Sequence, residues 1–360
     1  MAFRRRAGDR TADRRSDDVA DAAADRAPDR FRRPPPAYAA LDLGTNNCRL
    51  LIARPAAGGF QVIDSFSRII RLGEGVVASG RISEPAIERA TAALRICAGK
   101  LRRWRVRRGR YVATEACRKA VNCREFLDRV ESETGIRLEI IDTAEEASLA
   151  ARGCGPLLSA RRDHGIVFDI GGGSTEVVWL ARKRGRRLRF VDTISIPIGV
   201  VTLADRLAGR DITPVLYDEL KAEARAPLVD FCAKHGIAGK VADGRVQMLG
   251  ASGTVTTVAG IHKRLPRYRR DDVDGALLDF AEIDAVTAGL FAVGADGRRA
   301  NPCVGPERAD LVLPGCAILD AIREQWPVGR LRVADRGVRE GILLSLMAAD
   351  RQPHDRRRRG

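Results

Sequence analysis

The chain has 360 residues, of which 45% are hydrophobic and 31% are charged, a composition typical of a soluble globular protein with enough core material for two packed domains. Its 63 Lys and Arg residues outnumber its 47 Asp and Glu residues, and the net charge of +16 favours polyanionic partners, although a genome rich in arginine codons produces the same excess. No run approaches the roughly 18 apolar residues of a membrane helix and residues 1–36 lack the apolar centre of a secretory signal, so we expect a cytoplasmic protein with no membrane partner.

The two ends of the chain differ in composition from its centre. Residues 1–36 are rich in Arg, Asp and Ala and close with three consecutive prolines, which predicts a disordered N-terminal tail and a stiff linker. Seven Asp among the ten Arg of this segment argue against a mitochondrial presequence, which is poor in acidic residues. Residues 351–360 include "DRRRRG" and predict a second disordered tail, which is basic.

Strands and helices are predicted to alternate between these tails. Two apolar runs, "AYAALDLG" and "CRLLIAR", flank a short polar turn, and this pattern predicts a β-hairpin. A helix is expected from Ser83, which can cap it, with Pro85 in its first turn and apolar residues at helical spacing from Ile87 to Leu101.

The region that follows continues this alternation. "RYVAT" predicts a strand, and Asn122 followed by Glu125 has the pattern of a helix start. "RLEIID" predicts another strand, which leads into a helix near Thr143.

The hairpin pattern occurs a second time beyond Arg162. "GIVFDIGGGSTEVVWLARK" repeats the order of "AALDLGTNNCRLLIARP": a strand, Asp-x-Gly, a small polar turn, a strand and Ala-Arg. The two aspartates, Asp42 and Asp169, stand 169 − 42 = 127 residues apart. Two hairpins with Asp-x-Gly at the same place predict duplicated α/β domains that face a shared cleft.

The three glycines of "DIGGGSTE" form a turn that suits an anion. Without side chains, backbone N–H groups can converge on a phosphate. A P-loop is excluded because no GxxxxGK[ST] run follows a strand, and a dinucleotide-binding turn is disfavoured because it needs a helix after its glycines. The residues that follow here, "EVVWLA", favour a strand. The sequence therefore predicts a phosphate-binding glycine turn within a hairpin.

This arrangement resembles the phosphate loops of the actin-like, sugar kinase and Hsp70 ATPase superfamily. More narrowly, the chain resembles the exopolyphosphatase/guanosine pentaphosphate phosphatase family. The stretches that carry the resemblance occur in family order: "LDLGTNNCRLLI" (41–52), "ATEACRKAVN" (113–122), "IIDTAEEASLA" (140–150), "VFDIGGGSTEVV" (167–178), "LGASGT" (249–254) and "ADRGVREGIL" (334–343).

The resemblance implies an α/β fold of two duplicated actin-like (ribonuclease H-like) domains with an interdomain cleft. Domain I would span residues 37–148 and be completed by a C-terminal helix within 338–350, and domain II would span 149–337. Two positions depart from the family pattern, because Ala334 and Arg336 stand where the family has Ser and Gly in a Ser-Asp-Gly stretch. The chain also ends where longer members continue into a helical C-terminal region.

The resemblance also implies the residues that bind phosphate. Arg118 follows the "VAT" strand and could hold a phosphate in a bidentate fork, with Arg49 as a weaker candidate. The "GASGT" turn could bind a nucleotide or further phosphates through its amides, or it could be a helix-packing turn. The phosphate-binding set is Asp42, Gly44, Thr45, Asn46, Arg118, Gly171, Gly172, Gly173, Ser174, Thr175, Gly250, Ser252 and Gly253.

The metal ion and the catalytic base follow from the same resemblance. Mg²⁺ is the expected cofactor, and Asp169 is its first candidate ligand, Glu176 its second and Asp42 a third that acts through water. The family's proposed general base falls on Glu146. Thr143-x-x-Glu146 also spells a helix capping box, and Asp142-x-x-Glu145 offers the same cap one residue earlier. The second register leaves Glu146 free to face the cleft, and the sequence does not choose between the two.

The implied function is a magnesium-dependent phosphohydrolase that removes terminal phosphate from inorganic polyphosphate or guanosine pentaphosphate. Aromatic residues make up 5% of the chain and are not interleaved with its basic runs, which argues against nucleic acid as a partner. A homodimer is common for such folds. The alternatives are an actin-like ATPase or kinase, and a polyanion-binding protein without turnover.

Overall fold

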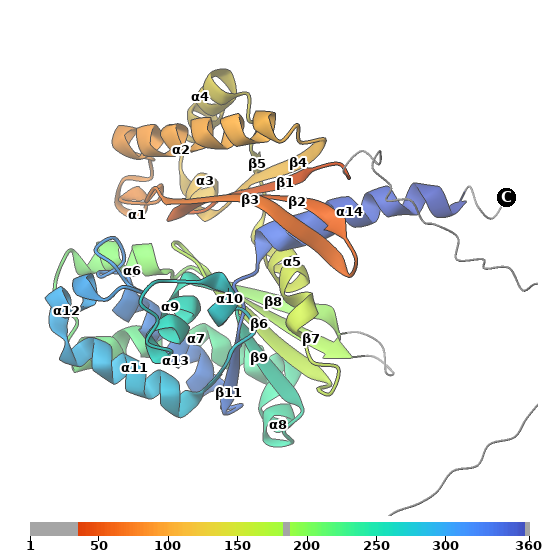
Figure 1. Cartoon of the computed structure of the whole chain (residues 1–360). Helices are drawn as coiled ribbons and strands as arrows, with labels where there is room; N and C mark the ends of the chain where they lie inside the picture. The colour runs from red at the N-terminus through yellow and green to blue at the C-terminus, as the bar shows by residue number, and fades with distance from the viewer. Residues whose placement is uncertain (1–34, 183–187, 357–360) are drawn as a thin grey trace, which may run out of the picture. The chain divides into compact units, whose positions relative to one another are not determined.

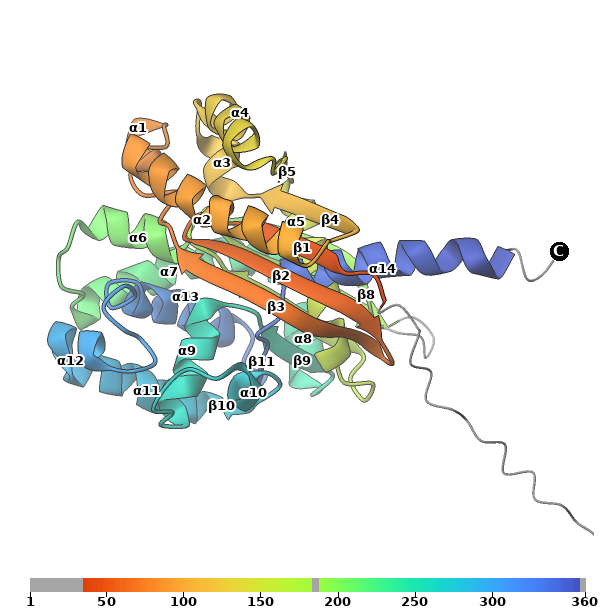
Figure 2. The same cartoon turned by 45° about the horizontal axis from the view of Figure 1, so that its top comes forward.

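The computed structural model describes residues 35–182 and 188–356, so most of the predicted N-terminal tail and residues 357–360 lie outside the described residues. The chain from Pro36 onward forms one compact unit with two β-sheets (Figures 1 and 2). We call the first sheet and the helices packed on it lobe I, and the second sheet and its helices lobe II. The prediction of a duplicated α/β fold is confirmed.

The sheet of lobe I contains the first predicted hairpin. Its strand order is β3-β2-β1-β4-β5, with β1 antiparallel to β2 and parallel to β4. The hairpin register places Asp42 directly opposite Arg49. A third antiparallel strand, β3, extends the hairpin in a segment for which the sequence analysis made no prediction. The strands are β1 (Tyr38–Leu43), β2 (Asn47–Ala56), β3 (Gly59–Ile69), β4 (Arg108–Ala113) and β5 (Glu139–Ile140).

The sheet of lobe II repeats this arrangement. Its order is β10-β11-β9-β6-β7-β8, so β6, β7 and β8 form the antiparallel meander and β9 pairs parallel to β6. The run after the three glycines is strand β7, as predicted, and Asp169 stands directly opposite Glu176. The strands are β6 (His164–Ile170), β7 (Thr175–Arg182), β8 (Leu188–Ile196), β9 (Val246–Gly250), β10 (Leu277–Asp279) and β11 (Arg330–Val333).

The helices of lobe I cover one face of its sheet. Helix α2 presents Ala90, Leu94 and Cys97 to this face, where they are fully buried, as their helical spacing predicts. The helix starts predicted at Ser83 and Asn122 are confirmed, because these residues stand at the N-cap positions of α2 and α4, although neither makes a side-chain capping hydrogen bond. Asn122 instead bonds both backbone groups of Ile82, a long-range contact that outcompetes the local cap. The helices are α1 (Val76–Ser79), α2 (Glu84–Arg103), α3 (Glu115–Lys119) and α4 (Cys123–Thr134).

Helix α5 (Thr143–Cys154) packs on both sheets. Leu149 packs with β1 and with helix α14 (Val338–Arg356), which lies on the other face of the lobe I sheet. Ala147 and Ala151, on its opposite side, pack against strands β6 and β7. A Cβ on Gly341 would lie 2.0 Å from the Leu149 carbonyl oxygen, so glycine allows α5 and α14 to approach closely.

Helix α5 therefore crosses the predicted domain boundary between residues 148 and 149, and both predicted boundaries stay predictions. Helix α14 continues to Arg356, into the segment predicted to be a basic tail.

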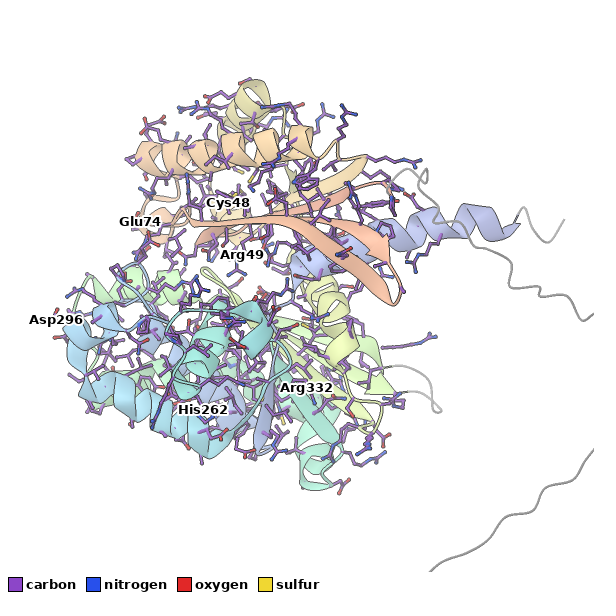
Figure 3. All side chains as sticks on the ribbon, in the orientation of Figure 1. Cys48, Arg49, Glu74, His262, Asp296 and Arg332 are labelled. Carbon is purple, nitrogen blue, oxygen red and sulfur yellow. The ribbon has the colours of Figure 1, made fainter. Side chains whose placement is uncertain are left out.

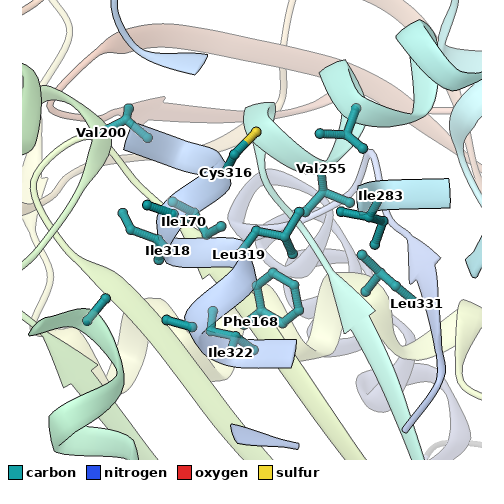
Figure 4. Packing of buried hydrophobic residues seen from close by; sticks show 14 of the residues in the cluster. Phe168, Ile170, Val200, Val255, Ile283, Cys316, Ile318, Leu319, Ile322 and Leu331 are labelled. Carbon is teal, nitrogen blue, oxygen red and sulfur yellow. The ribbon is translucent and has the colours of Figure 1, made fainter. Parts of the chain in front are cut away.

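The core of lobe II is centred on helix α13, whose residues are almost all buried. Figure 4 shows Ile318, Leu319 and Ile322 of α13 next to Phe168 of β6 and Val255 of α9. A helix that is buried on nearly all sides needs partners on all sides, and the sheet and α7 provide them, while the buried Asp320 accepts hydrogen bonds from Arg323 and Tyr217. The helices of lobe II are α6 (Val200–Leu207), α7 (Pro214–His235), α8 (Ile237–Ala242), α9 (Gly253–His262), α10 (Arg270–Val273), α11 (Phe280–Ala292), α12 (Gly294–Ala300) and α13 (Val312–Gln325).

Candidate active site

The turns of the two hairpins have the same backbone hydrogen bond. The Gly44 amide donates to the Asn47 carbonyl at 2.9 Å, and the Gly171 amide donates to the Ser174 carbonyl at 2.9 Å. After the role predicted for them, we call residues 44–47 phosphate loop I and residues 171–174 phosphate loop II. The duplication seen in the sequence therefore extends to the geometry of the turns.

Each phosphate loop is supported by a segment that follows the third strand of its meander. The Gly73 amide bonds the Thr45 carbonyl at 2.9 Å behind loop I, and the Val201 amide bonds the Gly172 carbonyl at 2.8 Å behind loop II. A Cβ on Gly199 would lie 2.4 Å from the Gly172 backbone. Glycine is required at this position because backbone atoms cannot move aside as a side chain can.

The two loops touch each other. A Cβ on Gly172 would lie 2.9 Å from the Thr45 Cβ and 3.1 Å from the Asn46 amide nitrogen. The missing side chain therefore allows the backbones of the two loops to converge, and converging N–H groups bind anions.

A narrow pocket of about 110 Å³ lies at this junction, and five carboxylates line it, one of which is Glu115 of α3. Asp42 comes from β1, Glu146 from α5, and Asp169 and Glu176 from the facing strands β6 and β7. Burial raises the pKa of Asp169 to about 7 and that of Glu176 to about 7, and burial also raises the pKa of Asp42. The concentration of buried negative charge would be relieved by a cation.

Glu146 is held by Arg118. Nη1 of Arg118 donates to Glu146 Oε2 at 2.8 Å, while its Nε and Nη2 donate to Glu115 Oε2. Burial raises the pKa of Glu146 to about 8, with a further contribution from the Glu176 charge, although Arg118 opposes the shift. A carboxyl group with a pKa near the working pH is suited to proton transfer.

The helix-capping question at α5 is answered by the structure. The Asp142 carboxylate accepts a hydrogen bond from the Glu145 amide at 2.7 Å, so Asp142 is the N-cap. Glu146 is not needed for capping, and its side chain lines the pocket.

Arg118 does not line the pocket as the phosphate-binding prediction requires. Its guanidinium donates to two carboxylates and to the Ile141 carbonyl oxygen, so it orients Glu146. Its binding of phosphate stays a prediction.

The "GASGT" turn is partly a packing turn. A Cβ on Gly250 would lie 2.7 Å from Phe168, so this glycine makes room for the core. Ser252 caps α9 through the Val255 amide at 3.1 Å, and Gly253 reaches the pocket.

Of the remaining predicted phosphate-binding residues, Gly173 and Thr175 do not line the pocket, whereas the others do. Thr175 is fully buried and donates to the Ile198 carbonyl, and Gly173 lies against Thr45 and Glu115. The predicted residues that line the pocket are Asp42, Gly44, Thr45, Asn46, Glu146, Asp169, Gly171, Gly172, Ser174, Glu176 and Gly253.

The sequence analysis missed Arg308, which lies in the loop before α13 and lines the pocket with Arg49. Within the described parts of the chain, neither guanidinium makes a hydrogen bond or ion pair. Burial and the nearby Arg49 charge lower the pKa of Arg308. Arg49 lies on the side of the lobe I sheet that faces lobe II (Figure 3). No motif surrounds Arg308, so only the fold could identify it.

A groove of about 1020 Å³ adjoins the pocket and shares Arg49, Gly253 and Arg308 with it. Three further arginines, Arg270, Arg336 and Arg339, line the groove together with several acidic residues. Two arginines that make no hydrogen bond or ion pair with described residues therefore stand where the narrow pocket adjoins the wider groove.

The family model of the Ppx/GppA phosphatase family matches residues 51–350 of this chain. The chain belongs to this family. It is a phosphohydrolase of the exopolyphosphatase family.

Known Ppx/GppA relatives match over nearly their whole length. Exopolyphosphatase 2 of Mycobacterium tuberculosis is 31% identical over 321 residues, which cover 86% of this chain and 98% of the relative. The crystal structure of an Aquifex aeolicus family member matches with a TM-score of 0.69 at 29% identity, over 88% of this chain and 99% of that one. An exopolyphosphatase-like protein matches with a TM-score of 0.76 at 30% identity, covering 86% and 97%. The described helices include none that is long and apolar enough to span a membrane.

Two residues that depart from the Ppx/GppA sequence pattern, Ala334 and Arg336, lie in different surroundings in the structure. Ala334 is buried in the cluster around α5. Arg336 donates to Asp274 at 2.8 Å and lines the groove, so it adds a cation where the family pattern has glycine.

The carboxylates of the pocket fit a magnesium ion. Oxygen donors from Asp169 and Glu176 face each other across one strand pair, and burial raises the pKa of both. In residues 35–182 and 188–356, no three His, Cys, Asp or Glu residues are grouped as a metal cage.

Proposed function

We propose that this chain is a magnesium-dependent exopolyphosphatase, which releases terminal orthophosphate from inorganic polyphosphate or from guanosine pentaphosphate. The observation that carries the proposal is the position of Glu146, which lines the same pocket as both phosphate loops and has a pKa raised to about 8. A single terminal phosphate would occupy the narrow pocket, and the remaining phosphates of a polyanion would extend into the groove beyond it.

The chain's own residues can perform the hydrolysis. The amides of loops I and II surround the terminal phosphate, and Arg118 fixes Glu146 Oε2, which leaves Oε1 to accept a proton from water. The water oxygen attacks phosphorus in line, the bridging P–O bond breaks, and the shortened chain departs as an anion while the proton stays on Glu146. Magnesium, held by Asp169 and Glu176, would neutralise phosphate charge.

The residual polyphosphate chain would lie in the groove and be held at its mouth by Arg49 and Arg308. An arginine without a partner in a partly buried site retains its full capacity to bind phosphate oxygens, and charge-assisted hydrogen bonds of this kind are about twice as strong as neutral ones. The same two arginines would bind the phosphates of guanosine pentaphosphate, so they do not distinguish the two substrates.

A substrate panel tests the proposal. Phosphate release is measured from long-chain polyphosphate, guanosine pentaphosphate and ATP, first with Mg²⁺ and then with a chelator. We expect release from polyphosphate or guanosine pentaphosphate that stops when the metal is removed. Turnover of ATP alone would indicate an actin-like ATPase or kinase instead. Salt-sensitive binding of polyphosphate without release would indicate a binding protein.

A further inference from the structure

The segment that supports phosphate loop I also reaches across to lobe II. The Ile70 and Arg71 amides donate to the Asn46 carbonyl at 2.8 and 3.1 Å, and the Gly73 amide donates to Thr45. Arg71 has a φ of +46°, which few residues other than glycine adopt and which costs about 1 kcal/mol. The backbone of this turn is therefore fixed to loop I in an unfavourable conformation.

The side chain of Arg71 binds the loop of lobe II that carries Arg308. Its Nη1 and Nη2 donate to the two carboxylate oxygens of Asp310 at 3.0 Å each, and Nη2 also donates to the Glu307 carbonyl at 2.9 Å. Asp310 and Glu307 flank Arg308 in the sequence. One side chain thus connects phosphate loop I to the arginine at the mouth of the pocket.

A second hydrogen bond joins the lobes nearby. The Gly75 amide, from the same turn of lobe I, donates to Asp205 Oδ2 of helix α6 at 3.0 Å. Helix α6 begins at Val200, whose amide supports loop II by donating to the Gly171 carbonyl. The turn at residues 70–75 therefore contacts structures behind both phosphate loops.

We propose that Arg71 and Asp310 are positioning residues that hold lobe I against the Arg308 loop of lobe II and so keep the pocket closed around the terminal phosphate. Neither residue needs to contact substrate. The pair acts by fixing where Arg308 lies relative to loop I. For its effect on substrate, the inference rests on the proposed polyphosphate hydrolysis.

The directions in which two substitutions change polyanion binding distinguish a positioning role from a simple charge effect. If the pair acted only through its charge, Arg71→Gln would weaken binding of a polyanion and Asp310→Asn would strengthen it, because it removes a negative charge near the groove. If the pair positions the loop, both substitutions weaken binding, and the double variant is no worse than either single one.

The kinetic experiment measures phosphate release from polyphosphate with Mg²⁺ by the full chain. We expect Arg71→Gln and Asp310→Asn each to raise KM by roughly fivefold, the scale of a partly exposed ion pair, with a smaller change in kcat. Arg206→Gln is the matched control, because it removes a bidentate pair with Glu223 that lies wholly within lobe II. Opposite shifts for the two variants, or an equal shift in the control, would overturn the proposal.

A distance measurement tests the closure without turnover. Val121 in lobe I and Val293 in lobe II are exposed, and all eight native cysteines are buried, so cysteines placed at these two valines would accept spin labels selectively. We expect Arg71→Gln and Asp310→Asn to lengthen or broaden the distance between the labels, with Arg206→Gln unchanged. An unchanged distance in both variants, in chains shown to be folded by thermal unfolding, would refute the closure even if polyphosphate proved not to be the substrate.

Discussion

The two hairpins of this protein share a backbone and differ in charge. Both have Asp-x-Gly before the turn, the same hydrogen bond across it and a glycine-containing segment behind it. They differ opposite the aspartate: Asp42 faces Arg49 in lobe I, and Asp169 faces Glu176 in lobe II. Cross-strand neighbours lie about 5 Å apart, so one position in each hairpin sets the local charge.

This difference suggests how a duplicated scaffold becomes an asymmetric site. Lobe I presents a cation without a partner, which suits the phosphate chain. Lobe II presents two buried carboxylates whose pKa values are both raised to about 7, which suits a metal ion. Both hairpin turns come from the duplication, whereas the proposed difference in function would come from the residue opposite each aspartate.

The largest effect on turnover should come from replacing the aspartate of each hairpin in separate variants. If lobe II is the metal end, Asp169→Asn should lower kcat by about a thousandfold, whereas Asp42→Asn, beside Arg49, should lower it by about tenfold. Steady-state phosphate release over a range of Mg²⁺ concentrations measures both. Equal losses would mean that the hairpins are functionally equivalent.

Neutralising the cation of lobe I should affect binding more than chemistry. Arg49→Gln should raise KM for polyphosphate by roughly tenfold or more, since a hydrogen bond to a charged group contributes about 1.5–3 kcal/mol. The dependence of binding on salt should also become shallower by about one phosphate contact. Arg68→Gln is a control on the next strand, because Arg68 packs over Phe66 and lines neither the pocket nor the groove. Identical results for the two variants would remove Arg49 from the site.

The supporting glycines allow a comparison of stability. Gly199→Ala should destabilise the fold by about 1–3 kcal/mol, because the new Cβ meets the backbone of loop II at 2.4 Å. Gly73→Ala should cost less, because the Cβ there meets the methyl group of Thr45, a side chain that can shift. Chemical denaturation measures both, and a larger loss at Gly73 would contradict this ranking.

The last comparison concerns the dependence of stability on pH. Without metal and phosphate, the folded chain keeps protons on Glu146, with a pKa of about 8, and on Asp169 and Glu176, with pKa values of about 7. The unfolded chain has already lost these protons, so it binds fewer, and stability should fall as pH rises from about 5 to about 8. Glu146→Gln should flatten this decline, as followed by thermal unfolding in the presence of a chelator. A stability that rises over this interval would mean that burial does not raise the pKa values of these carboxylates.

Much of the fold could be predicted because the hairpins are local. Alternating strands, Asp-x-Gly and the glycine run specify both turns, and Asp142 and Ser252 cap their helices as local patterns allow. Local patterns say less where distant contacts decide. The Asn122 side chain bonds Ile82 and not the first turn of α4, and Gly250 makes room for Phe168 of the core.

The site could be predicted less completely than the fold. Arg118 has the residue type of a phosphate ligand, yet two carboxylates from different elements occupy it. Arg308 stands in a loop without a motif, and its importance depends on its proximity to Arg49, which lies on the other lobe. Charge complementarity between segments far apart in sequence leaves no local pattern to detect.

The most direct test of the proposed mechanism is phosphate release by Glu146→Gln. The amide keeps the shape of the side chain but cannot accept the proton from water, so turnover should fall by a factor between about 10² and 10⁴ while polyphosphate binding is retained. Glu145→Gln is the neighbouring control, since Glu145 pairs with Arg110 away from the pocket, and it should retain activity. Unchanged turnover in Glu146→Gln would contradict the mechanism.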